Sequence, residues 1–221
     1  SPISLHASAD RYCRGDGTAT VTCPRRILLR PIPIRVTLGA GDKFDTGARG
    51  CGGGAGFESY FGYLAAAEFW GTAGGDQLYA KRGSVVHGCA GSDDVELVES
   101  RFIGGDGADF VDAKGGTVRG GDGGDQVETR GGGSAYGNAG NDSISDGSGR
   151  PKLVGGAGRD FLGSGSGRDR LIGGSSAETF FAGDGNDQVS AGAGDDDVSG
   201  DSGTDLIEGG ADQKDTEAHT P

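Results

Sequence analysis

The stretch Gly-Gly-Asp-Gly-Ala-Asp-Phe-Val-Asp, residues 104–112, decides the fold of this chain, because close copies of it recur along most of the sequence. Two other clear copies are Gly-Gly-Asp-Gly-Gly-Asp-Gln-Val-Glu at residues 120–128 and Ala-Gly-Asp-Gly-Asn-Asp-Gln-Val-Ser at residues 182–190. Their shared template is G-G-x-G-x-D-x-U-x, in which U is a large apolar residue. The glycines favour a tight turn, and the acid at position six places a carboxylate there. The apolar residue at position eight predicts an inward side chain on a short strand.

The spacing of the position-six acids indicates how the chain coils. These acids are 16 to 18 residues apart as far as Asp160 and nine residues apart after it. A coil of about 18 residues, built as loop, strand, loop and strand, explains both spacings. Before Asp160 only one side of each coil carries the motif, and after it both sides do. The candidate metal ligands on side one are Glu58, Asp76, Asp93, Asp109, Asp125, Asp142, Asp160, Glu178 and Asp196, and those on side two are Asp169, Asp187 and Asp205.

Two lanes of apolar residues follow the same register. Position eight of side one holds Tyr60, Leu78, Val95, Val111, Val127, Ile144, Leu162, Phe180 and Val198. The strand on the opposite side of each coil holds Phe69, Val86, Phe102, Val118, Ala135, Leu153, Leu171, Val189 and Ile207. Residues of these types favour strands, and stacked coils would pair them in parallel about 4.8 Å apart. The sequence therefore predicts an all-β fold, a parallel β-roll or β-solenoid with one thin core.

The composition indicates that this fold needs a cation. The 221 residues include 49 glycines, only 33% are hydrophobic, and the net charge is -13. Such a chain builds an ordinary core with difficulty, and its charge adds self-repulsion. A divalent ion between successive coils would neutralise carboxylates and fix the glycine-rich loops, so we expect folding to be coupled to metal binding. The acidic balance argues against a nucleic-acid partner.

The repeats resemble the RTX calcium-binding β-roll family over roughly residues 52–210. The resemblance implies a parallel β-roll with several Ca²⁺ ions between successive loops on the same side. It implies that the position-six carboxylates and the carbonyls of the glycine turns are the ligands, and that the protein is exported. The alternate half-turns between Glu58 and Asp160 lack the motif, as at residues 112–117 and 147–152, so we expect no calcium there.

The four cysteines are Cys13, Cys23, Cys51 and Cys89. An even number in an acidic protein of this kind predicts an oxidising, extracellular setting or a place at the cell surface. Cys13 and Cys23 are near enough in sequence to close a hairpin. The pairing of Cys51 with Cys89 stays open, because two coils would separate them by roughly 10 Å. No segment is apolar for long enough to predict a membrane span.

The chain divides into three expected regions. Residues 1–38 contain an apolar run and are expected to be β-rich, either capping the first coil or adding strands to a second subunit. Residues 39–210 form the calcium-binding β-roll. Residues 211–221 are a polar tail, of which residues 213–221 are expected to fray.

The motifs do not predict an enzyme. The chain has no His-Glu-x-x-His zinc motif and no phosphate-binding loop, and its histidines, His6, His87 and His219, are isolated in sequence. We predict a secreted calcium-binding structural or surface protein that associates end to end into filaments. An alternative is a folding and secretion module of a larger exported enzyme or adhesin. An ice-binding solenoid is disfavoured because the outward positions form no flat threonine array. Aromatic residues are predicted at outward positions, where they would meet a partner: Phe61, Tyr79, Phe110, Phe161 and Phe181.

Overall fold

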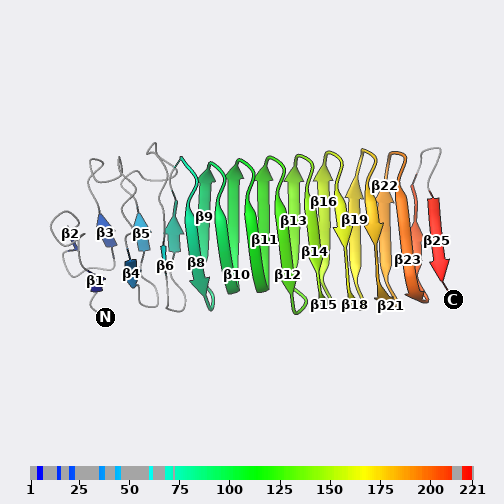
Figure 1. The fold of residues 1–221 in the computed structure, drawn as a ribbon, viewed down its shortest axis with the longest axis horizontal. Coiled ribbons are helices and arrows are strands. Elements are labelled where there is room, and N and C mark those ends of the chain that lie inside the picture. The colour runs from blue at the N-terminus through cyan, green and yellow to red at the C-terminus, as the bar shows by residue number, and fades with distance from the viewer. Residues whose placement is uncertain are drawn as a thin grey trace.

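The computed structural model of this protein shows β-strand coils that are stacked one after another in chain order (Figure 1). The structure describes residues 73–210 together with Trp70 and Gly71, and outside them the strand backbones β1–β7 and β25. No helix occurs in this described part of the chain. The described fold is thus the all-β parallel solenoid that the repeat predicts.

Each coil contributes one strand to each of two walls. Wall one follows the side-one loops and consists of β8 (Gln77–Lys81), the first halves of β10 (Asp94–Asp106) and β11 (Phe110–Asp122), β12 (Gln126–Arg130), β14 (Ser143–Asp146), β17 (Phe161–Gly163), β20 (Thr179–Phe181) and β23 (Asp197–Gly203). Wall two leads back to the side-one loops and consists of β9 (Val85–Ala90), the second halves of β10 and β11, β13 (Ser134–Ala139), β16 (Lys152–Ala157), β19 (Arg170–Gly174), β22 (Gln188–Gly192) and β24 (Leu206–Glu208).

Short strands also pair along the side-two loops of the later coils. These are β15 (Ser148–Gly149), β18 (Ser166–Gly167) and β21 (Asp184–Gly185), and each pairs in parallel with the next. Parallel pairing between coils therefore continues around the turn and is not confined to the walls.

The parallel register confirms the coil lengths expected from the acids. Val95 pairs with Leu78 in the preceding coil and with Val111 in the following coil. Farther along, Leu162 pairs with Phe180, a step of 18 residues. Variation in coil length is taken up in the half-turns, so position eight stays in line from coil to coil.

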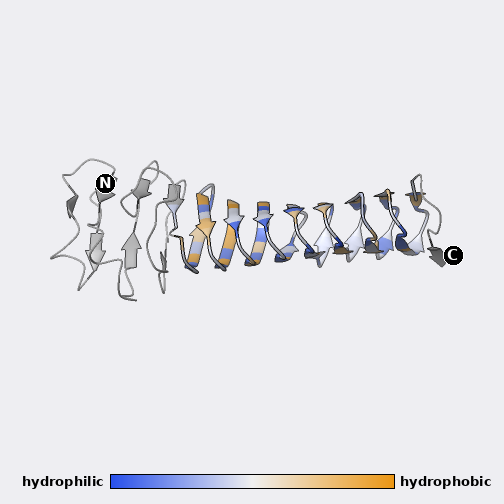
Figure 2. Cartoon of the chain, turned by 90° about the horizontal axis from the view of Figure 1, so that it is seen from above, coloured by the Kyte–Doolittle hydropathy of each residue, from blue (hydrophilic) through white to orange (hydrophobic). Residues whose placement is uncertain are grey.

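Both predicted apolar lanes face the interior. Leu78 and the described position-eight residues after it are buried, and so are the lane residues of wall two from Val86 to Val189. Ile207 is partly buried against the same cluster. Figure 2 shows hydrophobic and hydrophilic residues alternating along the strands of the first described coils. The side chains of Tyr60 and Phe69 lie outside the described residues.

A third inward lane lies two residues after position eight on wall one. It holds buried Ala80, Leu97, Ala113, Thr129 and Asp146 in successive coils. The sequence pattern did not predict this lane, because its residues differ in size and polarity from coil to coil. The lane therefore changes from apolar to acidic at Asp146, inside the stack.

The strands at the two ends are described by their backbones. β1 (Ser4–His6) pairs antiparallel with β4 (Arg35–Thr37), and β2 (Arg14–Gly15) pairs antiparallel with β3 (Thr20–Thr22). Parallel pairing begins with β5 (Lys43–Asp45), β6 (Tyr60–Phe61) and β7 (Glu68–Trp70). At the other end β25 (Thr216–Thr220) pairs with β23. β25 lies within the tail that is expected to fray, and the remainder of regions 1–38 and 211–221 lies outside the described residues.

Candidate metal centre

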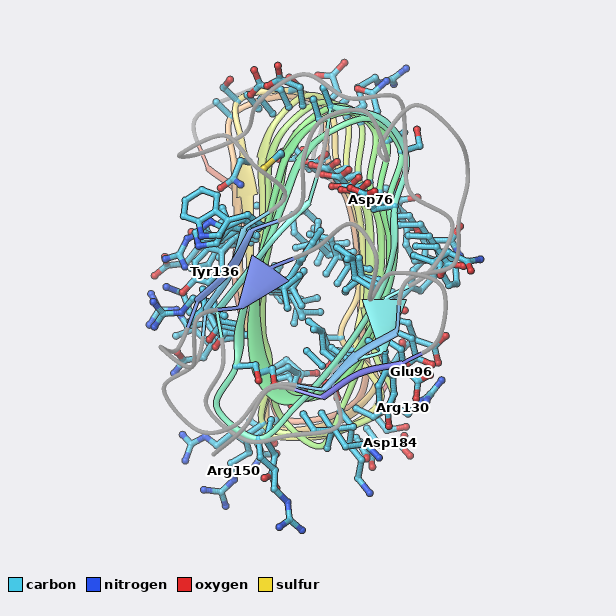
Figure 3. The ribbon with its side chains drawn as sticks, turned by 90° about the vertical axis from the view of Figure 1, so that its left-hand side faces the viewer. Asp76, Glu96, Arg130, Tyr136, Arg150 and Asp184 are labelled. Carbon is cyan, nitrogen blue, oxygen red and sulfur yellow. The ribbon has the colours of Figure 1, made fainter. Side chains whose placement is uncertain are left out.

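The position-six acids of side one form a line inside the coils. Figure 3 looks along the stack and shows Asp76 beside a row of carboxylate oxygens on the inner side of the ribbon. The members of this row are almost completely buried: Asp76, Asp93, Asp109, Asp125, Asp142, Asp160, Glu178 and Asp196. The repeat therefore brings together the predicted ligands from Asp76 onward, while Glu58 lies outside the described residues.

Backbone hydrogen bonds hold each carboxylate between two coils. The N–H of Asp93 donates to Oδ1 of Asp109 at 3.0 Å, and the N–H of Asp109 donates to Oδ1 of Asp125 at 2.9 Å. The same bond recurs from Asp76 to Asp93, from Asp125 to Asp142, from Asp142 to Asp160 and from Glu178 to Asp196. We call this arrangement the side-one ladder.

The second carboxylate oxygen of many ladder members has no hydrogen-bond partner among the described residues. This holds for Oδ2 of Asp93, Asp125, Asp142 and Asp160 on side one. A buried anionic oxygen without a partner is strongly destabilising in an apolar interior. These oxygens therefore indicate where a cation would be stabilising.

Glycine at position one creates the space in front of these oxygens. A Cβ atom added at Gly104 would collide with Oδ2 of Asp109 and with the carbonyl oxygen of Gly120 in the next coil. A Cβ atom at Gly120 would likewise meet the carboxylate of Asp125 and, at 2.9 Å, the carbonyl oxygen of Gly137. Carboxylate and carbonyl oxygens thus border one small space in each coil. Oxygen ligands of these two kinds are the ones that Ca²⁺ prefers, so the residues present fit the ion.

Burial makes the metal-free carboxylates weak acids. It raises the pKa of Asp93 to about 8, although the N–H of Asp76 lowers it, and neighbouring Asp109 and Asp76 raise it further. Burial also raises the pKa of Asp109, Asp125 and Asp142 to about 6 in each case. Ionising all of these carboxylates at once is therefore energetically unfavourable in the metal-free protein. A bound divalent cation would offset this cost.

The three predicted ligands of side two form a second, shorter ladder. The N–H of Asp169 donates to Oδ1 of Asp187 at 2.8 Å, and the N–H of Asp187 donates to Oδ1 of Asp205 at 2.9 Å. Asp169 and Asp187 are buried. Each has one carboxylate oxygen without a partner in the described part of the chain, namely Oδ1 of Asp169 and Oδ2 of Asp187.

Glu178 departs from the pattern because its side chain is longer by one methylene. Its carboxylate accepts hydrogen bonds from the N–H groups of Gly174 at 3.1 Å and Ser176 at 3.2 Å, within its own loop. Burial raises its pKa to about 7. The acid is thus in line with the ladder but is anchored within its loop.

Asp146 is a buried acid that the repeat did not predict. It lies at position one of a half-turn on side two, where the template has glycine, and it accepts a hydrogen bond from the hydroxyl of Thr129 at 2.6 Å. Periodicity could not identify it, because the neighbouring coils hold Thr129 and Ser164 at this position.

Carboxylates from different coils do not converge in threes. Within the described residues no group of three or more His, Cys, Asp or Glu side chains could hold an ion. A ladder site therefore combines carboxylates with backbone carbonyls. Cys89 is the sole cysteine within residues 73–210, so no disulfide can join two described residues. The pairing of Cys13 with Cys23 stays a prediction, and the pairing of Cys51 and Cys89 stays open.

Residues 136–171 and 172–212 match the family model of the RTX calcium-binding nonapeptide repeat, which spans four copies of the repeat. Repeats of this family bind calcium, which supports Ca²⁺ as the cation that the ladder geometry fits. The hydrogen-bonded ladder continues in the same register through Asp76, Asp93, Asp109 and Asp125, N-terminal to the matched residues. No curated protein and no solved structure matches this chain significantly.

Two further sequence predictions concern the surface. The rings of Phe110, Phe161 and Phe181 are outward and exposed, as predicted, and the Phe161 and Phe181 rings lie 5.7 Å apart. Tyr79 is half-buried beneath the Nζ atom of Lys81, and Phe61 lies outside the described side chains. Among the described residues, no helix is long and apolar enough to cross a membrane.

Proposed function

We propose that this chain is a secreted structural solenoid whose folding depends on Ca²⁺ binding between successive coils. The observation that carries the proposal is the row of buried carboxylates, several of which present an oxygen without a partner to a space left by glycine. Bound calcium supplies the positive charge that neutralises this row. The ligands would be the side-one acids from Asp76 to Asp196 and the side-two acids Asp169, Asp187 and Asp205, together with glycine carbonyls.

The chain's own residues account for the dependence on the ion. Parallel pairing brings each carboxylate next to another one coil away, about 4.8 Å along the stack. In the unfolded chain the same groups are hydrated and far apart. Repulsion and desolvation therefore oppose folding until a cation is bound, which makes metal binding part of the folding free energy.

An extracellular location follows from the same reasoning. Calcium-binding modules outside cells commonly bind at about 10⁻⁴ to 10⁻³ M, the concentration range of free calcium there. Such a chain would stay unfolded before export and fold after it. The alternative role, as a folding and secretion module of a larger exported enzyme or adhesin, uses the same chemistry.

Calcium titration of the full chain tests the proposal. Circular dichroism should show little β-structure in chelator and a cooperative gain of β-structure as calcium rises, and Mg²⁺ at equal concentration should not replace it because Mg²⁺ demands a tighter octahedral shell. The same β-spectrum with and without chelator would refute calcium-dependent folding.

A second candidate function, assembly of several copies, is favoured by the charge on the two walls. On wall one, positions seven and nine of the repeat carry five acids and, within the described residues, no basic side chain; the acids are Asp94, Glu96, Asp112, Glu128 and Asp197. Basic residues follow only at the edge of this wall, where Arg130 pairs with Asp112 at 3.2 Å and Glu128 at 2.8 Å. The centre of wall one is therefore acidic.

Wall two has the opposite charge. Its outward residues beside the inward lane include Arg101, Arg119, Lys152 and Arg170, and Glu208 is the one acid at these described positions. Two more exposed acids, Asp106 and Asp122, lie at the ends of β10 and β11 next to the side-one loops. Tyr136 adds an aromatic surface, with Arg119 5.0 Å and Lys152 5.2 Å from its ring centre. Figure 3 shows Glu96 and Tyr136 outside opposite walls of the coil.

These walls are complementary in charge, so wall one of one copy fits wall two of another. When wall one of one copy binds wall two of the next, each end of the assembly keeps one free wall. Further copies can then be added, which gives extended assemblies when the contacts do not close into a ring. The predicted contact through residues 1–38 lies outside the described residues.

Light scattering in about 10⁻³ M calcium, within the extracellular range, tests assembly. Arg119→Glu should reduce association, whereas Arg159→Glu, the same charge change in an exposed side-one loop, should not. A wild-type chain that stays monomeric at high concentration would contradict assembly without affecting the calcium proposal.

A further inference from the structure

The side-two ladder begins at a half-turn where the motif is missing. Lys152 pairs with Arg170, so Pro151 occupies the position that corresponds to Asp169 in the next coil. In the regular ladder the N–H at this position would donate to Asp169, but proline has no N–H. This explains why Oδ1 of Asp169, although buried, has no hydrogen-bond partner within the described residues.

The backbone around that oxygen is arranged as it is around Oδ1 of Asp187 one coil later, except that Oδ1 of Asp187 accepts the N–H of Asp169. A Cβ atom added at Gly167 would lie 2.8 Å from Oδ1 of Asp169 and would collide with the carbonyl oxygen of Gly149 in the preceding coil. One coil later, a Cβ atom at Gly185 would lie 2.8 Å from Oδ1 of Asp187 and would collide with the carbonyl of Gly167. The carbonyl of Gly149 and the unpartnered Oδ1 of Asp169 therefore border the same place, which no backbone N–H fills in this half-turn.

Pro151 stands where the ladder would have an acid, and Asp146 is a buried acid in the same half-turn. It is buried in the coil that contains Gly149, and the residue aligned with it in the next coil is Ser164, whose hydroxyl donates to Oδ2 of Asp169. Asp146 is therefore one coil away from the hydroxyl that bonds with Asp169, and among the described residues no basic side chain forms an ion pair with either acid.

We propose that Asp146 and Asp169, with the Gly149 carbonyl and the Ser164 hydroxyl, form an additional calcium site that starts the side-two ladder. This inference rests on the proposed function and departs from the expectation that the half-turn at residues 147–152 takes no calcium. Both oxygens of Asp146 already accept hydrogen bonds, from Thr129 at 2.6 Å and from the N–H of Ser148 at 2.8 Å. Each carboxylate oxygen has a second lone pair, so these bonds orient Asp146 without preventing it from binding an ion.

Positive side chains near this half-turn should make calcium binding at the additional site weak. Arg150 and Arg168 are exposed on the same two loops, and Figure 3 shows Arg150 extending away from the coil. Their charges reduce the attraction for a cation without blocking the inward oxygens. We therefore expect this ion to bind last.

The test counts calcium ions bound to the full chain by equilibrium dialysis and elemental analysis. Asp146→Asn keeps the shape and can still bond with Thr129 and Ser148, but it removes the charge, so it should bind one ion fewer than the wild type. Asp197→Asn, the same change at an exposed outward position of wall one, should bind the wild-type number. An unchanged count in Asp146→Asn overturns the additional site while leaving the proposed function intact, whereas a wild type without calcium refutes the proposed function itself.

A second variant keeps the test decisive if Asp146→Asn does not fold in saturating calcium. Ser164→Ala installs the residue that the next coil has at Ala182, so the fold should accept it. It should weaken the last binding step about tenfold, the lower bound for losing a group that supports a metal site. A last binding step equal to that of the wild type would overturn the role of this half-turn.

Discussion

Asp125→Asn should have opposite effects on the metal-free and the calcium-bound protein. Asp125 is buried, accepts the N–H of Asp109 through Oδ1, and has an Oδ2 atom without a partner in the described structure. Asparagine is nearly the same size and can still accept that N–H bond through its own oxygen. The substitution therefore removes the buried charge and leaves the backbone ladder in place.

The magnitude follows from the raised pKa. Burial raises the pKa of Asp125 from 3.8 to about 6, which corresponds to about 3 kcal/mol of destabilisation once the group is ionised. Well below pH 3.8 the carboxyl is protonated in the folded and unfolded states alike, so its charge costs nothing. The cost grows as the pH rises towards 6 and is complete above it. Asp125→Asn should therefore stabilise the metal-free protein by up to about 3 kcal/mol at pH 8 and by little at pH 4.

In the presence of calcium, Asp125→Asn should destabilise the folded protein instead of stabilising it. Asp125 lies between two coils and would contribute to the ions on either side of it, so its loss should raise the calcium concentration needed for half-folding by about tenfold or more. Folding of the metal-free chain can be driven with an excluded osmolyte such as sucrose and followed by circular dichroism. The exposed Asp197→Asn is the matched control and should change neither midpoint appreciably. If Asp125→Asn instead destabilises the chain in chelator at pH 8, the buried charge is not what prevents metal-free folding.

Four further outcomes are expected. Removal of calcium from the wild type should abolish its β-sheet circular dichroism, and about 10⁻³ M calcium should restore it; a chelated protein that keeps its thermal melting transition would argue against coupling. Because burial raises the pKa of Asp93 to about 8 and of Asp109 to about 6, the metal-free chain should gain stability as the pH falls through this range, while protons compete with calcium; a calcium midpoint independent of pH would show that these acids are not ligands. Gly120→Ala should destabilise the folded chain by about 1–3 kcal/mol, because its Cβ would meet Asp125 and the Gly137 carbonyl. Gly147→Ala, with no atom within 4 Å, should be neutral or stabilising by about 0.5 kcal/mol in the same urea titration. Anomalous diffraction should place ions along side one from the Asp76 coil onward and along side two from the Asp146 half-turn onward; an ion at the Lys114 half-turn would contradict the assignment of ligands.

The sequence alone determined the coil and its register. Position six and position eight recur with a fixed separation, and a parallel solenoid repeats the same chemical environment once per coil, so linear spacing translates directly into stacking. The alignment of Val95 with Leu78 and Val111 follows from their shared place in the repeat, and the parallel pairing has the same register. The same reasoning identified the buried acids of both ladders from Asp76 onward.

Features that break the repeat were decided only by the tertiary structure. Asp146 lies at a position where the motif has no acid. It accepts hydrogen bonds from Thr129 in the preceding coil and from the N–H of Ser148 in its own half-turn. The free oxygen of Asp169 depends on Pro151, which lies 18 residues away in sequence but one coil away in space. Glu178 was predicted as a regular ligand, yet its extra methylene lets it bond within its own loop. A periodic sequence specifies the average environment of a coil, but the partners of an exceptional residue come from adjacent coils, and only the packed stack reveals them.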